Sequence, residues 1–484
     1  MLKKILVVFI ITLLLIDIGY SFIQFYNIPF DGDMSRCIVP AKEVKSILEN
    51  PLGIKILTDN ITYLNPNRFF CHWSFSEYFN NVPLLLQNFT SPINSAYLSC
   101  ALAKIIIQVI IIFLLSLLIS GGFLKFDFLV AAILITPLFQ TNGYRTYMGI
   151  IDPSTTYTFF YALPMILIII YFMPLYLKYI HGFELKKMTY LKYLWIPLAL
   201  VSSLSGPLNP GVSLVISLLI FIYFFSNNFS KSDVKDIFSK IRQVMKNIPK
   251  DVLFYLLPLC LFSLYSLFLG RFNSENISNE LTLTEIYLRL PIGIYYLFTQ
   301  KLGFPILFLI LTINTLIIHY KVKNSEGKKI LKMFKWIGFF ALIYILLLPL
   351  GGYRSYRPNI IRYDTFMPIT LGLIFIYAKM SIFILKYLSN KLKYWYVSLL
   401  ILVVFIFTNA DKPCFNQNIC ERNSINQIAN SKEKIVKIND DCTVLSWEVI
   451  DNPTKSELNT KLLKKWKIIN DDKLYYQSSS INSK

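Results

Sequence analysis

Long apolar runs separated by short polar ones dominate the chain from its start to about residue 410. Runs such as 105–118, 163–171, 214–225 and 396–407 each lie in an apolar stretch of about 20 residues, which can cross a hydrocarbon layer of about 30 Å. The pattern predicts an all-α, polytopic membrane protein with about eleven transmembrane helices. These helices are expected at residues 4–26, 99–120, 124–141, 157–179, 190–206, 211–226, 251–269, 303–320, 336–350, 365–387 and 394–410.

Two polar regions divide the chain further. Residues 27–99 predict a long first outer loop, in which residues 41–52 read as a helix and residues 82–96 as an interfacial stretch. Residues 411–484 predict a small extracytoplasmic C-terminal domain that follows the transmembrane domain, residues 1–410. Within the transmembrane domain, the segment 271–302 contains an apolar half interrupted by Arg and Pro, and we expect this segment to be re-entrant or interfacial.

The placement of basic residues gives the chain a predicted orientation. Of its residues 55% are hydrophobic and only 16% charged, yet the net charge is +20, carried mostly by Lys between the apolar segments. This distribution follows the positive-inside rule and not a nucleic-acid-binding pattern. It places the N-terminus in the cytoplasm and the C-terminus outside. The inner connections hold Lys125, Lys186, Lys187, Lys192, Lys231, Lys235, Lys240, Arg242, Lys246, Lys250, Lys321, Lys323, Lys328, Lys329, Lys332, Lys335, Lys386, Lys391 and Lys393.

The N-terminus and the cysteines refine this prediction. Lys3 and Lys4 precede an apolar run with no small-residue cleavage site after it, so we expect an uncleaved first helix.

Five of the seven cysteines fall in the regions expected outside, where Cys37–Cys71 and Cys414–Cys420 are candidate disulfides and at least one thiol stays unpaired. The cysteine and histidine spacings match no zinc site.

Two carboxylates follow the first helix, in the sequence Pro29-Phe30-Asp31-Gly32-Asp33. In an extended turn they can point the same way, and Gly32 allows a tight bend. Such a pair can act as a general base, or hold a divalent cation such as Mg²⁺ or Mn²⁺. The structural alternative is an acidic turn that ends a helix.

An arginine-rich outer loop is the strongest chemical signal in the sequence. Three arginines lie within nine residues on the side where the positive-inside rule disfavours them, and the loop contains no Lys. Arg binds phosphate through two parallel hydrogen bonds, and neighbouring Tyr rings can stack on a sugar. The alternative is that these arginines bind lipid headgroups, Asp364 or other outer carboxylates. The candidate substrate-binding residues here are Tyr353, Arg354, Tyr356, Arg357, Arg362, Tyr363 and Asp364.

Two further outer segments add candidates for substrate binding. Arg68 and His72 lie in the first loop, where His72 either acts in acid–base or phosphate chemistry or packs within the loop. Tyr144 and Arg145 repeat the Tyr-Arg-x-Tyr pattern of the arginine-rich loop. Since no P-loop or GxGxxG is present, these residues favour a phosphorylated, lipid-linked substrate at the outer surface.

An uncleaved first helix, acidic Asp31 and Asp33 in a long first outer loop, about eleven helices and a basic outer loop resemble the GT-C class of membrane glycosyltransferases. The resemblance covers residues 1–410 and is one of architecture. It implies sugar transfer from a polyprenyl-phosphate carrier to an acceptor at the outer face, with Asp31 or Asp33 as the catalytic carboxylate. The second acidic pair found in some members is not evident, which leaves metal use open. The Lys-, Ile- and Asn-rich composition is typical of a bacterial protein, which suggests the cytoplasmic (inner) membrane.

Two other functional classes fit part of the same pattern. A lipid-linked polysaccharide polymerase or ligase also uses outer-face arginines, but its large loop usually comes late in the chain. A transporter or flippase is expected to show charges at mid-helix, or broken helices in matching halves. The apolar runs are nearly free of charge and no internal repeat is detected. The sugar donor and the bilayer are therefore the expected partners, and the acceptor is left open.

Overall fold

The computed structural model describes residues 2–184, 191–278, 281–351 and 359–477 and is 73% helical, which confirms the all-α prediction. Among these described residues, nine helices are long and apolar enough to cross a membrane, two fewer than expected. They are Lys4–Tyr26, Pro92–Ser120, Thr155–His181, Asn209–Lys231, Lys250–Gly270, Gly303–Tyr320, Ser325–Gly351, Tyr363–Tyr387 and Asn390–Ala410.

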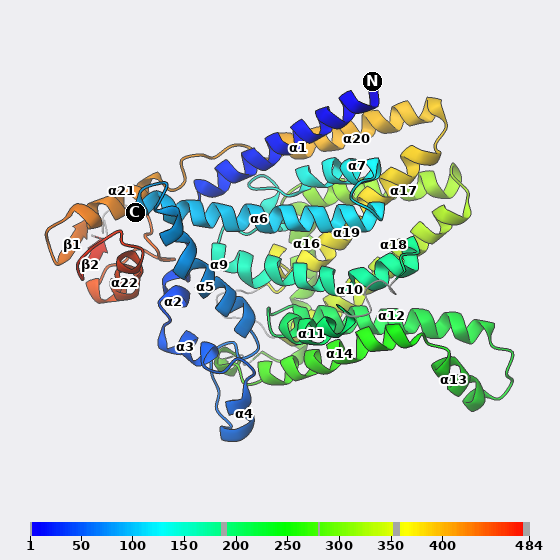
Figure 1. Ribbon diagram of the computed structural model, residues 1–484, viewed down its shortest axis with the longest axis horizontal. Helices are drawn as coiled ribbons and strands as arrows, with labels where there is room; N and C mark the ends of the chain where they lie inside the picture. The colour runs from blue at the N-terminus through cyan, green and yellow to red at the C-terminus, as the bar shows by residue number, and fades with distance from the viewer. Residues whose placement is uncertain (1, 185–190, 279–280, 352–358, 478–484) are drawn as a thin grey trace.

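Nearly every long apolar run forms a long helix, labelled in Figure 1. They are α1 (Leu2–Tyr26), α6 (Pro92–Ser120), α10 (Leu163–His181), α12 (Asn209–Lys231), α14 (Lys250–Gly270), α17 (Gly303–Tyr320), α18 (Ser325–Leu347), α19 (Tyr363–Tyr387) and α20 (Asn390–Ala410). Helix α10 continues backward through a π-helical turn, Thr158–Ala162, into the short α9 (Thr155–Tyr157).

Two expected spans form shorter helices. Helix α7 (Phe126–Ile135) runs into a 3₁₀ turn, Thr136–Leu138, that contains Pro137. Proline lacks the N–H that an α-helix needs and disfavours helical backbone before it, which accounts for an early end. Helix α11 (Trp195–Ser203) has nine residues. The segment 271–302 likewise forms only α15 (Leu283–Leu288) and α16 (Leu290–Thr299), both too short to span.

Helices α6 and α19 form the centre of the bundle. Within their most apolar windows, 61% of α6 and 78% of α19 is buried, whereas only 11% of α1 and 22% of α20 is. Helix α6 packs against α1, α5 and α7, and α19 packs against α17, α18 and α7. Polar side chains in the middle of α6, such as Lys104 and Gln108, are therefore enclosed by protein.

The first loop is mostly helical. It contains α2 (Met34–Ile38), α3 (Lys42–Leu48), α4 (Ile54–Asp59) and α5 (Phe69–Leu86). Helix α3 confirms a helix within residues 41–52, although it ends at Leu48. Helix α5 was not expected, and the interfacial stretch 82–96 is divided between the end of α5 and the start of α6.

The C-terminal residues form a small α/β unit. It contains α21 (Ile419–Asn430), β1 (Ile435–Ile438), α22 (Glu457–Lys465) and β2 (Leu474–Gln477), and its two strands pair in parallel with Ile435 opposite Leu474. The unit packs on the first loop, because the buried Trp466 indole N–H donates to the Phe79 carbonyl at 3.0 Å. Gln87 of the first loop donates in return to the Trp466 carbonyl at 2.6 Å.

The disulfide prediction is wrong in both of its pairs. Cys420 is bonded to Cys442, and Cys37, Cys71 and Cys414 are free thiols. The chain between α21 and residue 442 turns back through β1, which brings two cysteines 22 positions apart together. The predicted pairs rested on the order of the cysteines in the sequence alone, and that order does not show where the chain reverses direction.

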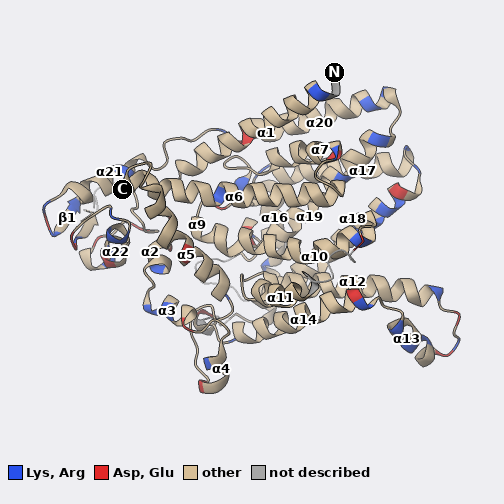
Figure 2. Cartoon of the chain, viewed as in Figure 1, with Lys and Arg blue, Asp and Glu red and all other residues tan. Residues whose placement is uncertain are grey.

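The bundle therefore has two different ends. At the capped end, residues 27–91 and 411–477 pack together over the helix termini. At the opposite, basic end lie the start of α1 and the connections from α12 to α14, α17 to α18 and α19 to α20, where Figure 2 shows many Lys and Arg. These three basic connections, which the sequence predicts to be inner ones, thus share one end of the molecule with the start of α1.

Candidate functional site

Asp31 is buried at the capped end, where it joins the first loop to a membrane helix. Its side chain is 4% exposed. One carboxylate oxygen accepts the Thr156 hydroxyl at 2.7 Å, and the other accepts the Thr156 N–H at 3.0 Å. The N–H of Asp33 also donates to Asp31, at 3.1 Å. A carboxylate at the first turn of a helix satisfies N–H groups that lack helical partners, so Asp31 caps the helix Thr155–His181.

Gly32 lies directly under the C-terminal unit. A Cβ at this position would lie 2.4 Å from the Trp447 backbone nitrogen and 2.6 Å from its indole ring. A side chain does not fit there, so glycine is required by close approach of the two segments. The Trp447 indole remains 54% exposed beside Tyr157, with ring centroids 6.0 Å apart. The Asp-Gly-Asp turn is thus covered on one side by an accessible aromatic ring.

Lys104 places a cation in the middle of the central helix α6. It is 1% exposed, and its ammonium group donates to the Pro153 carbonyl. The charges of Asp31, Asp152 and Arg145 act on this ammonium. A buried charge is stable only when it is compensated by hydrogen bonds and opposite charges, and the Pro153 carbonyl and the nearby carboxylates supply both to Lys104.

Asp152 is the second carboxylate of this group. It is buried in the turn before α9 and accepts the Ser154 N–H at 2.7 Å. Burial raises the pKa of Asp152 to about 6, against the opposing effect of a hydrogen bond from Tyr363. Tyr363 therefore connects Asp152 to the start of α19. A carboxyl group that titrates near neutral pH is suited to proton transfer.

Arg362 and Asp364 pair with each other at the same helix start. The Arg362 guanidinium lies 2.9 Å from the Asp364 carboxylate, which is buried and also accepts the Thr365 N–H at 2.8 Å. The Arg362 Nε atom is buried and has no hydrogen-bond partner among the described residues. The ion pair with Asp364 is the structural role that the sequence analysis set against substrate binding for this arginine. The Nε–H of Arg362 is a donor to which no described residue is bonded.

Arg145 and Tyr144 lie in the short turn after α7. The guanidinium of Arg145 donates to the Thr141 carbonyl at 3.0 Å, and the Tyr144 ring packs edge-on against Phe407 at 5.5 Å. Asp411, just after α20, accepts the Thr141 N–H at 2.9 Å. Arg145 is close enough to act electrostatically on both Asp411 and Lys104. It therefore belongs to the cluster, whereas Tyr144 packs between helices.

Arg68 and His72 lie directly before and within α5. The His72 ring is buried against Phe160 at 4.5 Å, and its Nδ1 lies 3.9 Å from the Cys37 sulfur. Burial lowers the pKa of His72 to about 3, and Arg68 adds to the effect, so the imidazole is neutral at physiological pH. His72 Nε2 and Arg68 Nε have no hydrogen-bond partner in the described part of the chain. The geometry is that of a packed histidine.

Glu421 is the main contribution of the C-terminal unit to the site. Its buried carboxylate accepts the Phe30 N–H at 2.8 Å, the Tyr97 hydroxyl at 2.7 Å and the Leu445 N–H at 2.9 Å. These donors come from the first loop, α6 and the C-terminal unit. Burial raises the pKa of Glu421 to about 7. Glu421 therefore fixes the residue before Asp31 to two other parts of the chain.

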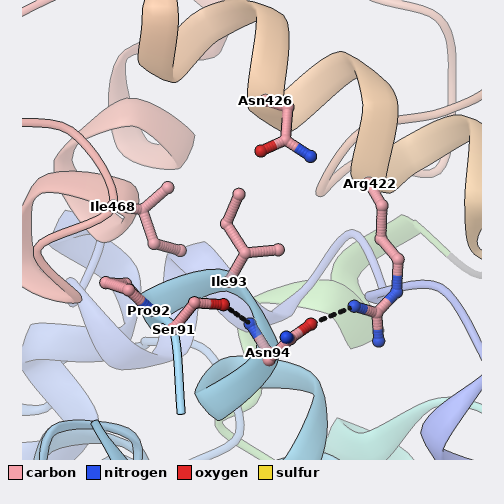
Figure 3. Close-up of a pocket in the computed structure, with 7 residues that line it drawn as sticks. All are labelled: Ser91, Pro92, Ile93, Asn94, Arg422, Asn426 and Ile468. Carbon is pink, nitrogen blue, oxygen red and sulfur yellow. Dashed lines mark hydrogen bonds between the residues drawn. The ribbon is translucent and has the colours of Figure 1, made fainter.

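A surface hollow of about 360 Å³ lies beside Glu421, between α21 and the start of α6. Figure 3 shows Arg422 donating to the Asn94 side chain, a bond of 2.8 Å, with Asn426 one turn further along the same helix and Ile468 on the opposite side. The Arg422 guanidinium stacks on Tyr97, 3.8 Å from the ring centroid. Arg422 thus supports the same Tyr97 whose hydroxyl binds Glu421.

Four of the candidate substrate-binding residues, Tyr353, Arg354, Tyr356 and Arg357, lie outside the described residues. The described residues contain no group of three or more His, Cys, Asp or Glu side chains arranged to hold a metal ion. The oxygens of Asp31 already accept three hydrogen bonds. A cation at Asp31 and Asp33 stays a prediction.

Three residues of the site were missed by sequence reasoning. Lys104 carried a usable signal, because a lysine inside a run that includes Ile105 to Ile107 is rare unless it is functional or paired. Asp152 follows the Tyr144–Arg145 segment closely in the sequence but was not assigned to the site. Glu421 has no comparable signal, because its hydrogen-bond partners are not its neighbours in the sequence. They are Phe30, Tyr97 and Leu445.

No protein-family model, curated protein or solved structure matches this chain.

Proposed function

We propose that the chain is a membrane glycosyltransferase that moves a sugar from a polyprenyl-phosphate carrier to an acceptor glycan, lipid or protein at the outer face of the membrane. One observation carries the proposal. Asp31, Lys104, Asp152, Arg362 and Tyr363, far apart in the chain, belong to one buried polar cluster at the capped end. Enclosed clusters of ionisable groups drawn from distant parts of the chain are characteristic of catalytic sites.

The reaction assigns a role to each kind of side chain. Asp31 or Asp33 accepts the proton of an acceptor hydroxyl, whose oxygen then bonds to the anomeric carbon of the sugar. The bond from that carbon to the carrier phosphate breaks, and the phosphate oxygen keeps the electron pair. Arg354, Arg357 and Arg362 are proposed to stabilise that departing charge. Each donor of this kind contributes about 3 kcal/mol to the transition state.

The proposed orientation follows from the basic end of the bundle. With Lys-rich connections in the cytoplasm, the capped end faces outward, where a polyprenyl-phosphate sugar is available and soluble nucleotide sugars are scarce. The disulfide Cys420–Cys442 fits an oxidising compartment on that side. The bacterial cytoplasmic membrane is the proposed location, with the N-terminus inside.

Sugar transfer with labelled polyprenyl-phosphate donors tests the proposal. The full-length protein is reconstituted in liposomes, and Asp31→Asn and Asp33→Asn are assayed separately. Loss of the catalytic base should lower the rate by about 10² to 10⁴-fold in one of them. Asp451→Asn, an exposed carboxylate of the C-terminal unit, is the matched control. Full transfer by both folded Asp variants removes these carboxylates from the mechanism.

Donor binding gives a second, separate measurement. Arg357→Ala and Arg357→Lys should both weaken binding of the labelled carrier, because a lysine cannot reproduce the two-pronged contact of arginine with phosphate. If the wild-type protein binds the carrier and transfers nothing to any glycan, lipid or peptide acceptor, the enzyme proposal fails.

A transporter or flippase is the second candidate, and Lys104 is the observation that favours it. Lys104 and Lys379 lie inside the central helices α6 and α19, which weakens the expectation that the apolar runs are nearly free of charge. Charged residues in membrane helices often line substrate paths. Movement of a labelled lipid across the bilayer without any transfer product would support this class. A polysaccharide polymerase would instead yield products longer than one added unit.

A further inference from the structure

Helix α13 (Ile237–Lys246), between α12 and α14, has one strongly apolar side. With 3.6 residues per turn, its apolar residues fall within an arc of about 120°. They are Ile237, Phe238, Ile241, Val244 and Met245. The opposite side contains Ser239, Gln243 and Lys246. This division is typical of a helix that lies at a boundary between water and an apolar phase.

Most of that apolar arc is not covered by protein in the described chain. Ile237 is 53% exposed, Phe238 80%, Ile241 39% and Met245 42%, whereas Val244 is fully buried. Leaving such a row of large apolar side chains in water is unfavourable, since removing apolar surface from water stabilises a protein. An apolar surface beyond the described residues is therefore expected to cover them.

Basic side chains border the apolar arc on both edges. Lys240 lies about 40° beyond one edge and Arg242 about 40° beyond the other, at 100° per residue. The helix contains three basic residues and no acidic one. Long basic side chains beside an apolar face can extend to phosphate groups while their stems remain in the apolar layer. The partner should thus be apolar below and negatively charged at its surface.

Contacts at both ends fix the direction in which the arc points. Toward α12, the Lys240 ammonium lies 4.4 Å from the Phe229 ring centroid, and the Ser232 hydroxyl donates to Gln243 at 2.7 Å. Toward α14, Ile248 is buried in a cluster with Tyr171 and Val252. Helix α13 therefore contacts the end of α12, and the turn that follows it packs beside α14.

The position of α13 along the bundle identifies the apolar surface. Helices α12 and α14 are both long enough to span, and α13 joins their ends at the basic end (Figure 1). That point is the boundary between hydrocarbon and headgroups. We infer that α13 lies in the headgroup region of the same membrane and binds anionic phospholipids, with Phe238 and Ile241 among the acyl chains and Lys240 and Arg242 on headgroup phosphates. This inference does not depend on the proposed enzyme activity.

Hydrogen exchange of the full-length protein in nanodiscs tests the inference. Exchange of the amides of residues 236–247 is compared in phosphatidylcholine and in phosphatidylcholine mixed with phosphatidylglycerol. Each basic side chain near an anionic surface strengthens association about fivefold. We therefore expect exchange at least about tenfold slower in the anionic discs.

Two double variants separate the contributions. Lys240→Gln with Arg242→Gln should abolish the difference between the two lipids, and Phe238→Ser with Ile241→Ser should abolish protection in both. Lys434→Gln with Lys437→Gln, both exposed at the capped end, should change neither. Equal exchange of the wild-type segment in the two lipids overturns the inference. Protection that appears only with an added soluble protein overturns it as well, in favour of a protein partner.

Discussion

The two ends of the molecule use charge in opposite ways. At the basic end, lysines and arginines lie on exposed connections, and α13 leaves both its cations and its apolar side chains at the surface. At the capped end, Lys104, Asp31, Asp152 and Glu421 are buried and bonded to groups from distant segments. Charged residues therefore influence membrane topology at the basic end, whereas at the capped end they join distant segments of the chain through buried hydrogen bonds.

This contrast predicts different sensitivity to substitution. An exposed charge interacts weakly because water screens it, and its removal typically changes stability by less than about 0.5 kcal/mol. A buried charge leaves its partners unpaired when it is lost, which destabilises by several kcal/mol. Four measurements test how far this difference extends.

The largest effect is expected at Lys104. Lys104→Met removes a buried cation whose charge acts on Asp31 and Asp152, and it should lower stability by about 3 to 5 kcal/mol, because two buried carboxylates lose a counter-charge. Thermal unfolding in detergent measures the change. Lys391→Met, at an exposed position of the basic end, is the control and should stay within about 0.5 kcal/mol. Similar values for the two variants would remove the distinction between the ends.

The disulfide of the capped end comes next. Replacing Cys420 and Cys442 by Ser together opens a loop of 22 residues, which should destabilise the C-terminal unit by about 3 kcal/mol. Hydrogen exchange of residues 419–477 reports this directly. Cys414→Ser, which removes an exposed free thiol, should leave exchange unchanged. Unchanged protection in the double variant would mean that docking on the first loop alone holds the unit.

A substitution at Gly32 is expected to have a smaller effect on stability, which a matched glycine substitution isolates. Gly32→Ala forces a methyl group against Trp447 and should destabilise by about 1 to 3 kcal/mol. Gly338→Ala is the matched substitution, because a Cβ there meets nothing within 4 Å on helix α18. That control should be neutral or stabilising by about 0.5 to 1 kcal/mol. A stable Gly32→Ala protein would show that Trp447 moves away readily.

The smallest effect concerns pH. The pKa of Glu421 in the folded protein is about 7, above its ordinary value of 4.5, so the folded state holds the proton more tightly than the unfolded state. The stability it contributes is present at low pH and is lost as the pH rises through 7. Between pH 6 and pH 8 the loss should be about 1 kcal/mol.

The variant Glu421→Gln cannot titrate and should show a flatter pH dependence of unfolding than the wild type. Glu457→Gln, an exposed carboxylate of the same unit, serves as the control. A wild-type protein that becomes more stable from pH 6 to pH 8, with Glu421→Gln unaffected, contradicts the assigned pKa.

The positions of most long helices could be predicted from the sequence, because the length of an apolar run is enough to indicate a membrane-spanning helix. The runs at 303–320 and 365–387 coincide closely with α17 and α19. The runs at 124–141 and 190–206 were misjudged, since hydropathy does not report where a proline such as Pro137 ends a helix.

The site was less accessible to the same reasoning. Asp31 was identified as a candidate because two carboxylates one residue apart are visible locally. Its partners Thr156, Lys104 and Asp152 become neighbours only through the packing of α6 against the start of α9. The pairing of Cys420 with Cys442 likewise depends on a chain reversal. Contacts between residues far apart in the chain have no local pattern from which to predict them.

The bond between Glu421 and Phe30 also sets an order of events during synthesis. The two residues are separated by 391 positions, so the donor is made long before its acceptor. At about 5 to 20 residues per second, the Asp31 turn waits about 20 to 80 s on the ribosome-bound chain before Glu421 exists. The turn that carries Asp31 is thus completed only near the end of synthesis, although it is among the first segments to be translated.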